Sequence, residues 1–239
     1  MSGPERELPF DRREPPGELP AEPPPILPSQ RYGRYVALLA ILILVLITIN
    51  TAVTKPNGAT GLTPGTAAPP FAVPLVLGNL PGAADVATHA NEGAAGRVPA
   101  CKERGQQILN ICEQYEKGPV VLALFVDAGA CAQVLGDMQG LTASFPAVRF
   151  AAVSIKGDRT SLRELVRSRG LTFPVGIDAD GALAALYKVA SCPQLTLIYP
   201  GGVVQSPPLL RRPPPGVLRA RVSELLAAAR ARGWRGPAG

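Results

Sequence analysis

The stretch FVDAGACAQV, residues 125–134, decides the fold, because two kinds of periodicity meet in it. The apolar run VVLALFV (120–126) leads into it, and a continuous apolar run of this length indicates a strand buried on both faces. In the run that follows, CAQVLGDMQGLTASF (131–145), apolar residues recur at helical spacing. The stretch therefore predicts a strand, a turn and a helix, with the thiol of Cys131 where the helix begins.

The same alternation continues on both sides of this stretch. Strands are predicted at 148–155 and 194–199, with a short extended piece at 173–178 and a turn into VVQS (203–206). The segments predicted to be helical are 106–115, 161–170, 182–189 and 216–232. Ser161 and Glu164 form the pattern of a capping box at the start of one of them. The order of elements predicts an α/β domain, a central mixed sheet flanked by helices and ending in a hairpin and a closing helix.

Three further segments precede this domain, which is expected to span 71–234. Residues 1–34 are rich in proline and charge and poor in aliphatic residues, which predicts a disordered tail. Residues 35–54, YVALLAILILVLITINTAVT, carry no charge, and a helix of ~20 residues spans the roughly 30 Å of a bilayer core. We expect a single transmembrane helix there. Residues 55–70 are rich in Pro, Gly and Thr and are expected to form a flexible linker.

The charges beside the apolar segment predict its orientation. Arg31 and Arg34 precede it and Lys55 follows it, so the positive-inside rule predicts a cytoplasmic N-terminus and a domain outside the cytoplasm. We therefore expect a single-pass protein of the cell membrane. A cleaved signal peptide is the alternative, and the long polar tail and the length of the apolar segment disfavour it.

The net charge of the chain is +6, and much of the excess comes from arginines between residues 211 and 235. Glu224 is the one acidic residue in that stretch. We interpret these arginines as a solvated helix face, because the sequence contains no nucleic-acid-binding motif. No nucleic-acid partner is predicted.

Three stretches resemble the thioredoxin-like superfamily, in the form of the redoxins and the membrane-anchored TlpA/ResA-type proteins. They are GTAAPPFAVPLVLG (65–78), GPVVLALFV (118–126) and LYKVASCPQLTLIYPGG (186–202). The similarity covers 65–232. It implies a thioredoxin-like fold, a role in cell redox homeostasis as a thiol–disulfide oxidoreductase, and a cis peptide bond before Pro193.

The active-site motif departs from that family. The usual Cys-x-x-Cys is AGAC (128–131) here, so Cys131 stands alone. The resemblance places Cys192, next to the expected cis-proline, close to Cys131, and thereby implies a redox-active disulfide between the two. A helix N-terminus favours a thiolate, so we expect Cys131 to attack and Cys192 to resolve the mixed disulfide. The partner would be a protein thiol or disulfide, or a small thiol.

The remaining cysteines, Cys101 and Cys112, precede the central strand. Four cysteines in an oxidising compartment allow three connectivities. Local pairing of Cys101 with Cys112 agrees with the pair implied by the resemblance. A bond that closes this loop of ~12 residues contributes roughly 3 kcal/mol of stability, so we expect a structural disulfide rather than a second redox pair.

Other functions remain open at this point. A peroxiredoxin-like peroxide reductase with antioxidant activity would also use one thiol here, but the threonine expected three residues before Cys131 is Ala128. A redox-inactive binding or structural module is another alternative, in which Cys131 is a small buried apolar residue. His89 is the only histidine, and without Cys-x-x-Cys a zinc site is not expected. The sequence predicts neither a metal nor another cofactor.

Overall fold

The computed structural model describes residues 29–53, 60–92 and 96–236. The chain divides into two compact units, Met1–Lys55 and Pro56–Gly239. The predicted tail falls largely outside the described residues, as does the first part of the predicted linker. The rest of that linker belongs to the second unit, since the N–H groups of Gly65 and Ala68 donate to the carbonyls of Val204 and Gly202. The ordered domain therefore begins before the predicted residue 71.

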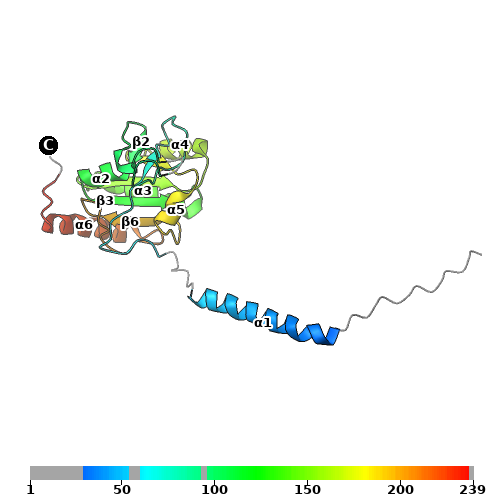
Figure 1. Cartoon of the computed structure of the whole chain (residues 1–239). Helices are drawn as coiled ribbons and strands as arrows, with labels where there is room; N and C mark the ends of the chain where they lie inside the picture. The colour runs from blue at the N-terminus through cyan, green and yellow to red at the C-terminus, as the bar shows by residue number, and fades with distance from the viewer. Residues whose placement is uncertain (1–28, 54–59, 93–95, 237–239) are drawn as a thin grey trace, which may run out of the picture. The chain divides into compact units, whose positions relative to one another are not determined.

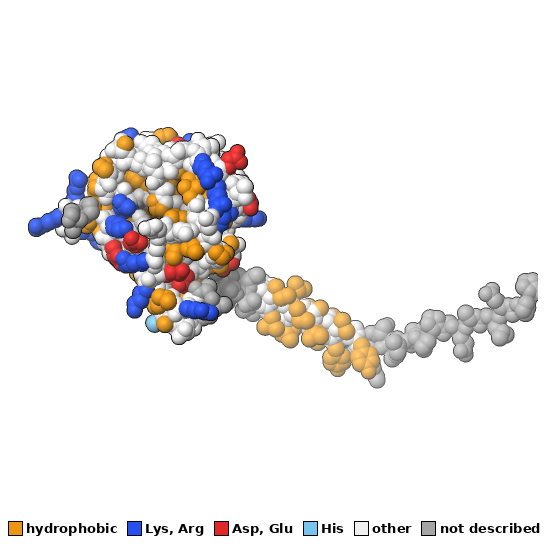
Figure 2. Space-filling model, turned by 90° about the horizontal axis from the view of Figure 1, so that it is seen from above, with side chains coloured by type: hydrophobic (Ala, Val, Ile, Leu, Met, Phe, Trp, Pro, Cys, Tyr) orange, Lys and Arg blue, Asp and Glu red, His pale blue; other side chains and the backbone are white. Residues whose placement is uncertain are grey.

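In the first unit, helix α1 (Ser29–Val53) contains the uncharged apolar run. Its described side chains are mostly hydrophobic, as Figure 2 shows. Among the residues that the structure describes, no helix has both the length and the apolar character required to cross a membrane. The prediction of a transmembrane helix at 35–54 is thus not supported here, and its last residue, Thr54, lies outside the described part of the chain.

The second unit is built on a four-stranded mixed sheet (Figure 1), whose strand order is β5-β4-β3-β6. The strands are β3 (Val120–Phe125), β4 (Arg149–Ser154), β5 (Val175–Ile177) and β6 (Gln194–Ile198). β3 is parallel to β4, β4 is parallel to β5, and β6 runs antiparallel to β3. Every residue of β3 is buried, which confirms that its apolar run is a strand covered on both faces.

The predicted strands at 120–126, 148–155 and 194–199 are confirmed as β3, β4 and β6. The fourth strand is β5, which lies in the segment predicted only as a short extended piece. The predicted hairpin into VVQS is reduced to an isolated bridge between Ile198 and Val204. The two glycines before it, Gly201 and Gly202, both have φ of 86°, a conformation that favours glycine.

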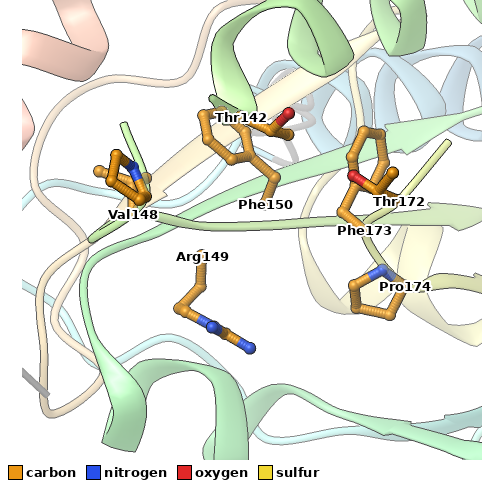
Figure 3. A pocket seen from close by; sticks show the side chains of 8 residues that line it. Thr142, Val148, Arg149, Phe150, Thr172, Phe173 and Pro174 are labelled. Atoms are coloured by element: carbon orange, nitrogen blue, oxygen red, sulfur yellow. The ribbon is translucent and has the colours of Figure 1, made fainter. Parts of the chain in front are cut away.

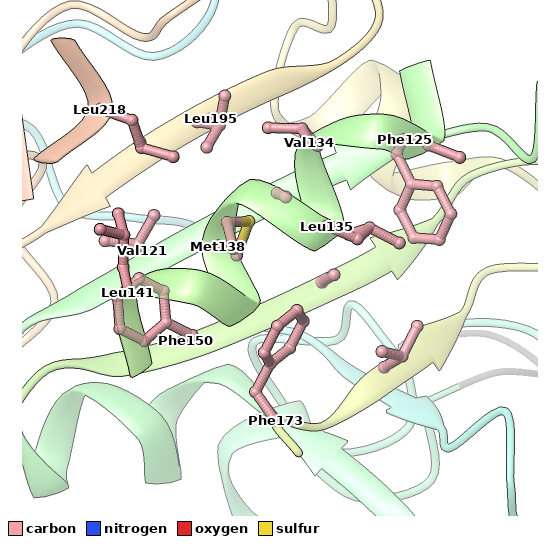
Figure 4. Packing of buried hydrophobic residues seen from close by; sticks show 14 of the residues in the cluster. Val121, Phe125, Val134, Leu135, Met138, Leu141, Phe150, Phe173, Leu195 and Leu218 are labelled. Atoms are coloured by element: carbon pink, nitrogen blue, oxygen red, sulfur yellow. The ribbon is translucent and has the colours of Figure 1, made fainter. Parts of the chain in front are cut away.

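The helices cover both faces of the sheet. They are α2 (Ile111–Lys117), α3 (Gly129–Thr142), α4 (Arg159–Ser168), α5 (Ala182–Leu186) and α6 (Pro215–Ala231). On one face, Met138 of α3 and Leu218 of α6 belong to a buried cluster with Phe150 of β4 (Figure 4). On the other face, Ile111 of α2 and Tyr187 pack in a second cluster. Each face of the sheet thus has its own apolar core.

The helix predicted at 106–115 begins later than expected, and residues before it form a strand. Strand β2 (Ile108–Asn110) pairs antiparallel with β1 (Ala72–Pro74). Asn110 then caps α2, because its side chain accepts hydrogen bonds from the N–H groups of Cys112 and Glu113. The apolar residues at helical spacing therefore belong partly to a strand.

The predicted capping box at Ser161 and Glu164 is wrong. Asp158 is the N-cap of α4, and its carboxylate accepts from the N–H groups of Thr160 and Ser161. These bonds hold the pKa of Asp158 below its usual value. The helix starts one turn earlier than the pattern predicts, because Asp is as good a cap as Ser.

Candidate active site

The junction between β3 and α3 positions Cys131. After Phe125 the chain turns at Ala128, whose N–H donates to the carbonyl of Val126 over 2.8 Å. Gly129 has φ of 40°, where a side chain would be strained. The N–H of Cys131 donates to the carbonyl of Ala128 over 3.0 Å. Cys131 therefore lies in the first turn of α3, as predicted, and its side chain is buried with 7% exposure.

The loop before β6 positions Cys192. The peptide bond between Cys192 and Pro193 is cis. The next residue, Gln194, is fully buried, and its Nε2 donates to the carbonyl of Tyr187 over 3.0 Å. Its Oε1 accepts from the N–H of Ala190 over 3.2 Å. These two bonds tie the loop to the end of α5, while Cys192 itself stays exposed.

A disulfide joins Cys131 to Cys192 across 61 residues of sequence. Their α-carbons are 5.3 Å apart, within the range that a disulfide requires. The backbone N–H of Val126 donates to both sulfurs, with 3.2 Å between nitrogen and sulfur in each case. The structure thus brings together the two cysteines that the sequence resemblance paired, and it adds a hydrogen-bond donor shared between them.

Two arginines fix the helix that carries Cys131. Arg212 donates from Nε and Nη2 to the two carboxylate oxygens of Asp137, over 2.6 and 2.8 Å, and from Nη1 to the side chain of Gln133. Arg169 donates to the carbonyl of Ala132. Sequence reasoning missed both, because Arg212 lies 75 residues from Asp137 and no local pattern connects them.

The second disulfide joins Cys101 to Cys112, with the α-carbons again 5.3 Å apart. Cys112 is 1% exposed, and the hydroxyl of Tyr115 lies 3.7 Å from the sulfur of Cys101. Buried Asn110 donates from Nδ2 to the carbonyls of Ala100 and Glu103, over 2.7 Å each. This side chain holds the two segments that the disulfide joins.

Two pairs of carboxyl side chains are joined by hydrogen bonds, Asp178 with Asp180 and Glu103 with Asp85. Upstream of Cys192, burial and then a hydrogen bond with Asp180 raise the pKa of Asp178 to about 6, while the same bond lowers the pKa of Asp180. Beside Cys101, burial and then a hydrogen bond with Asp85 raise the pKa of Glu103. In each pair, a hydrogen bond between the carboxyl groups contributes to the raised pKa of one member.

No group of three or more His, Cys, Asp or Glu side chains in the described ranges is arranged to hold a metal ion. His89 is exposed, and its Nδ1 lies 2.9 Å from Glu92. The hydrogen bond with His89 is the largest cause that lowers the pKa of Glu92, to about 2. The single histidine thus bonds an exposed carboxylate.

A pocket of about 180 Å³, shown in Figure 3, has neither Cys131 nor Cys192 in its lining. Its lining includes Thr142, the last residue of α3, with Phe150 and Phe173. Cys131 is in the first turn of the same helix, so roughly 16 Å of helix separates the two at 1.5 Å per residue. The chemistry of the cysteines therefore does not take place in this pocket.

The fold and this site can be compared with known proteins. Residues 94–206 match the sequence model of the AhpC/TSA family. A similar solved structure is described as a candidate thiol:disulfide interchange protein DsbE from Chlorobium tepidum, at 19% identity and a TM-score of 0.52, covering 70% of this chain and 98% of that one. Another is described as a candidate protein disulfide isomerase from Bacteroides thetaiotaomicron, at 14% identity and a TM-score of 0.52, covering 73% and 98%.

A third is the thioredoxin domain of a thiol-disulfide oxidoreductase from Bacteroides vulgatus, at 12% identity and a TM-score of 0.50, covering 69% of this chain and 99% of that one. No curated protein sequence gives a significant match. At these identities the solved structures establish the fold, which is thioredoxin-like. The segment that matches the AhpC/TSA family model lies within the domain that has this fold.

Proposed function

We propose that this protein is a thiol–disulfide oxidoreductase that works through the Cys131–Cys192 disulfide. One observation carries the proposal. The bond joins the first turn of α3 to the cis-proline loop, and one of its two cysteines, Cys192, is an exposed residue. An exposed disulfide beside a fixed N–H donor suits thiol exchange, because attack by a thiolate requires access to a sulfur and stabilisation of the thiolate that leaves.

The exchange follows from the chemistry of the two sulfurs. A partner thiolate bonds to one sulfur, the Cys131–Cys192 bond breaks, and the other sulfur leaves with the electron pair. A second partner thiolate then attacks the partner's own sulfur in the mixed disulfide and releases the reduced cysteines. The partner dithiol loses two electrons and two protons, and the protein disulfide gains them. The reverse sequence reduces a partner disulfide.

The partners and the compartment are part of this proposal. A protein thiol or disulfide, or a small thiol, would reach the exposed sulfur. Two disulfides within one domain support a location outside the cytoplasm, since reducing conditions inside cells disfavour them. The uncharged run at 35–54 in the sequence supports attachment to the cell membrane with a cytoplasmic N-terminus. Alkaline extraction of membranes from cells that express the full chain tests this attachment, and release into the soluble fraction would contradict it.

The test of the activity uses the full-length oxidised protein in a mild detergent. It is mixed with a reduced peptide that carries two cysteines, and the thiols are alkylated and mapped by mass spectrometry. We expect the peptide to become oxidised while Cys131 and Cys192 become reduced. The C131A/C192A variant should be inactive, and C101A/C112A is the matched control that should remain active. Equal peptide oxidation by C131A/C192A, or none by the wild type, would contradict the proposed activity and favour a redox-inactive binding or structural module.

The match to the AhpC/TSA family favours a second candidate function, peroxide reduction with Cys131 as the peroxide-reactive thiol. Ala128 stands where that chemistry would place a threonine, so the site lacks a side chain to position the peroxide. Adding hydrogen peroxide at low concentration to the reduced protein distinguishes peroxide reduction from thiol–disulfide exchange. Rapid peroxide consumption with sulfenic acid on Cys131 would support the second function, whereas slow oxidation supports exchange.

A further inference from the structure

We propose that Cys192 is the sulfur that bonds to the partner and that Cys131 is the sulfur that leaves and later resolves. This order is the reverse of the one that helix position alone predicts. The inference rests on the proposed function, because it assigns roles to the two sulfurs of the same disulfide.

Access to the two sulfurs is unequal. Cys131 is 7% exposed and belongs to the apolar cluster that includes Val134 and Leu135 of α3. Cys192 is exposed, although Pro193 and Gln194 after it are buried. In substitution at sulfur, the incoming sulfur lies in line with the bond that breaks. A partner that attacked Cys131 would have to reach a side chain packed in this apolar cluster, whereas Cys192 is open to solvent.

The surface beside Cys192 leaves room for this approach. The residues that replace the usual motif before Cys131 are Ala128, Gly129 and Ala130, all of them exposed and small. None of these three residues has a side chain larger than a methyl group. A cysteine on a flexible protein segment, or a small thiol, fits such a site better than a thiol fixed inside a folded domain.

The surroundings of Cys131 suit a leaving sulfur. The N–H of Val126 is 3.2 Å from it, and the N-terminus of α3, which no side chain caps, adds positive potential. Both favour the thiolate, and a sulfur that is stable as a thiolate leaves faster.

The steps balance as follows. The partner thiolate bonds to Sγ of Cys192, the Cys131–Cys192 bond breaks, and Cys131 keeps the electron pair as a thiolate. In the opposite direction, the thiolate of Cys192 attacks a partner disulfide and releases one partner thiolate. Cys131 then attacks Sγ of Cys192, restores the intramolecular disulfide and releases the second partner thiolate.

The test traps the mixed disulfide in full-length single-cysteine variants with oxidised glutathione as the probe. C131S keeps Cys192, and C192S keeps Cys131, while Cys101–Cys112 remains in both as an internal reference. We expect native C131S to form the glutathione adduct roughly tenfold faster or more than native C192S, because thiol reactivity follows access. In denaturant the two variants should react equally, which shows that the fold causes the difference.

A second measurement avoids substitutions. Reduced wild-type protein is mixed with oxidised glutathione, quenched with acid at early times and mapped, and the transient adduct is expected on Cys192. An adduct on Cys131, or a C192S variant that reacts as fast as C131S, would overturn the order of the sulfurs while exchange itself survives. A wild-type protein that does not exchange at all contradicts the proposed function as well.

Discussion

The two disulfides of this domain share one geometry but have different surroundings. In both, the α-carbons are 5.3 Å apart. Cys101–Cys112 closes a separation of 11 residues, and Cys112 is buried beside Asn110, whose side chain makes four hydrogen bonds to the same region. Cys131–Cys192 links segments 61 residues apart, and one of its cysteines, Cys192, is an exposed residue. The difference suggests that the role of a disulfide is set by what surrounds its sulfurs.

The hydrogen bonds near each disulfide support the same distinction. Near Cys112 they join the side chain of Asn110 to the backbone. Among the described residues no N–H donates to either sulfur there, and the hydroxyl of Tyr115 lies 3.7 Å from the sulfur of Cys101. At the other disulfide the N–H of Val126 donates directly to both sulfurs. A donor aimed at sulfur stabilises negative charge there, which an inert structural bond does not need.

The largest expected effect comes from removing the sulfur that resolves. The C131S variant should lose at least about a hundredfold in the steady-state oxidation of a two-cysteine peptide with oxidised glutathione as the terminal oxidant, because an intramolecular attack is far faster than one from solution. Peptide oxidation followed by mass spectrometry measures it. C101S/C112S is the matched control, and a comparable loss there would erase the distinction between the disulfides.

Removing the other disulfide should affect stability instead. Unfolding of C101S/C112S in guanidinium chloride should show a loss of roughly 3 kcal/mol in the free energy of unfolding, because the open loop gains entropy in the unfolded state. The rate of exchange at Cys192 should stay within about twofold of the wild type, since the local contacts there are unchanged. A variant that keeps its stability but loses exchange would reverse the roles proposed for the two bonds.

Asn110 sharpens the comparison further, because it supports Cys101–Cys112 without being part of it. N110A should lower the free energy of unfolding by about 2 kcal/mol, through the lost helix cap and the unpaired carbonyls of Ala100 and Glu103. The exposed Asn79 is the matched control, and N79A should cost less than about 1 kcal/mol. Urea titrations measure both, and equal losses would show that Asn110 has no special role.

The smallest effect concerns the carboxyl group upstream of Cys192. The pKa of Asp178 is about 6 in the folded protein and 3.8 in a model peptide, so between these values the folded state binds a proton that the unfolded state has lost. The free energy of unfolding should therefore fall as the pH rises through this window. D178N should reduce that slope, as measured by unfolding at several pH values. D180A should lower the pKa of Asp178, as measured by NMR titration.

The raised pKa of Glu103 predicts a slope of the same sign beside the other disulfide. E103Q is therefore the paired variant. If D178N leaves the dependence of stability on pH unchanged while E103Q removes it, Glu103 alone causes that dependence and the prediction for Asp178 is wrong.

The central strands and α3 are predictable from the sequence, because continuous apolar runs and helical spacing are local signals. The start of α2 is not, since it depends on Asn110 bonding to Ala100 and Glu103 in a separate segment. The association of Cys131 with Cys192 follows only from the family resemblance, as no pattern links residues 61 apart. The order in which Cys131 and Cys192 react with a partner is not predictable from the sequence either, because the burial of Cys131 depends on tertiary packing.

The most direct test of the distinction between the two disulfides is a redox titration of the full-length protein. The protein is equilibrated with graded ratios of reduced to oxidised dithiothreitol, trapped with acid and mapped by mass spectrometry. We predict that Cys131–Cys192 opens at a ratio at least about tenfold lower than Cys101–Cys112, because exposed exchange-active disulfides are more easily reduced than enclosed structural ones. If the two bonds open together, or Cys101–Cys112 opens first, the proposed division between a redox bond and a structural bond is wrong.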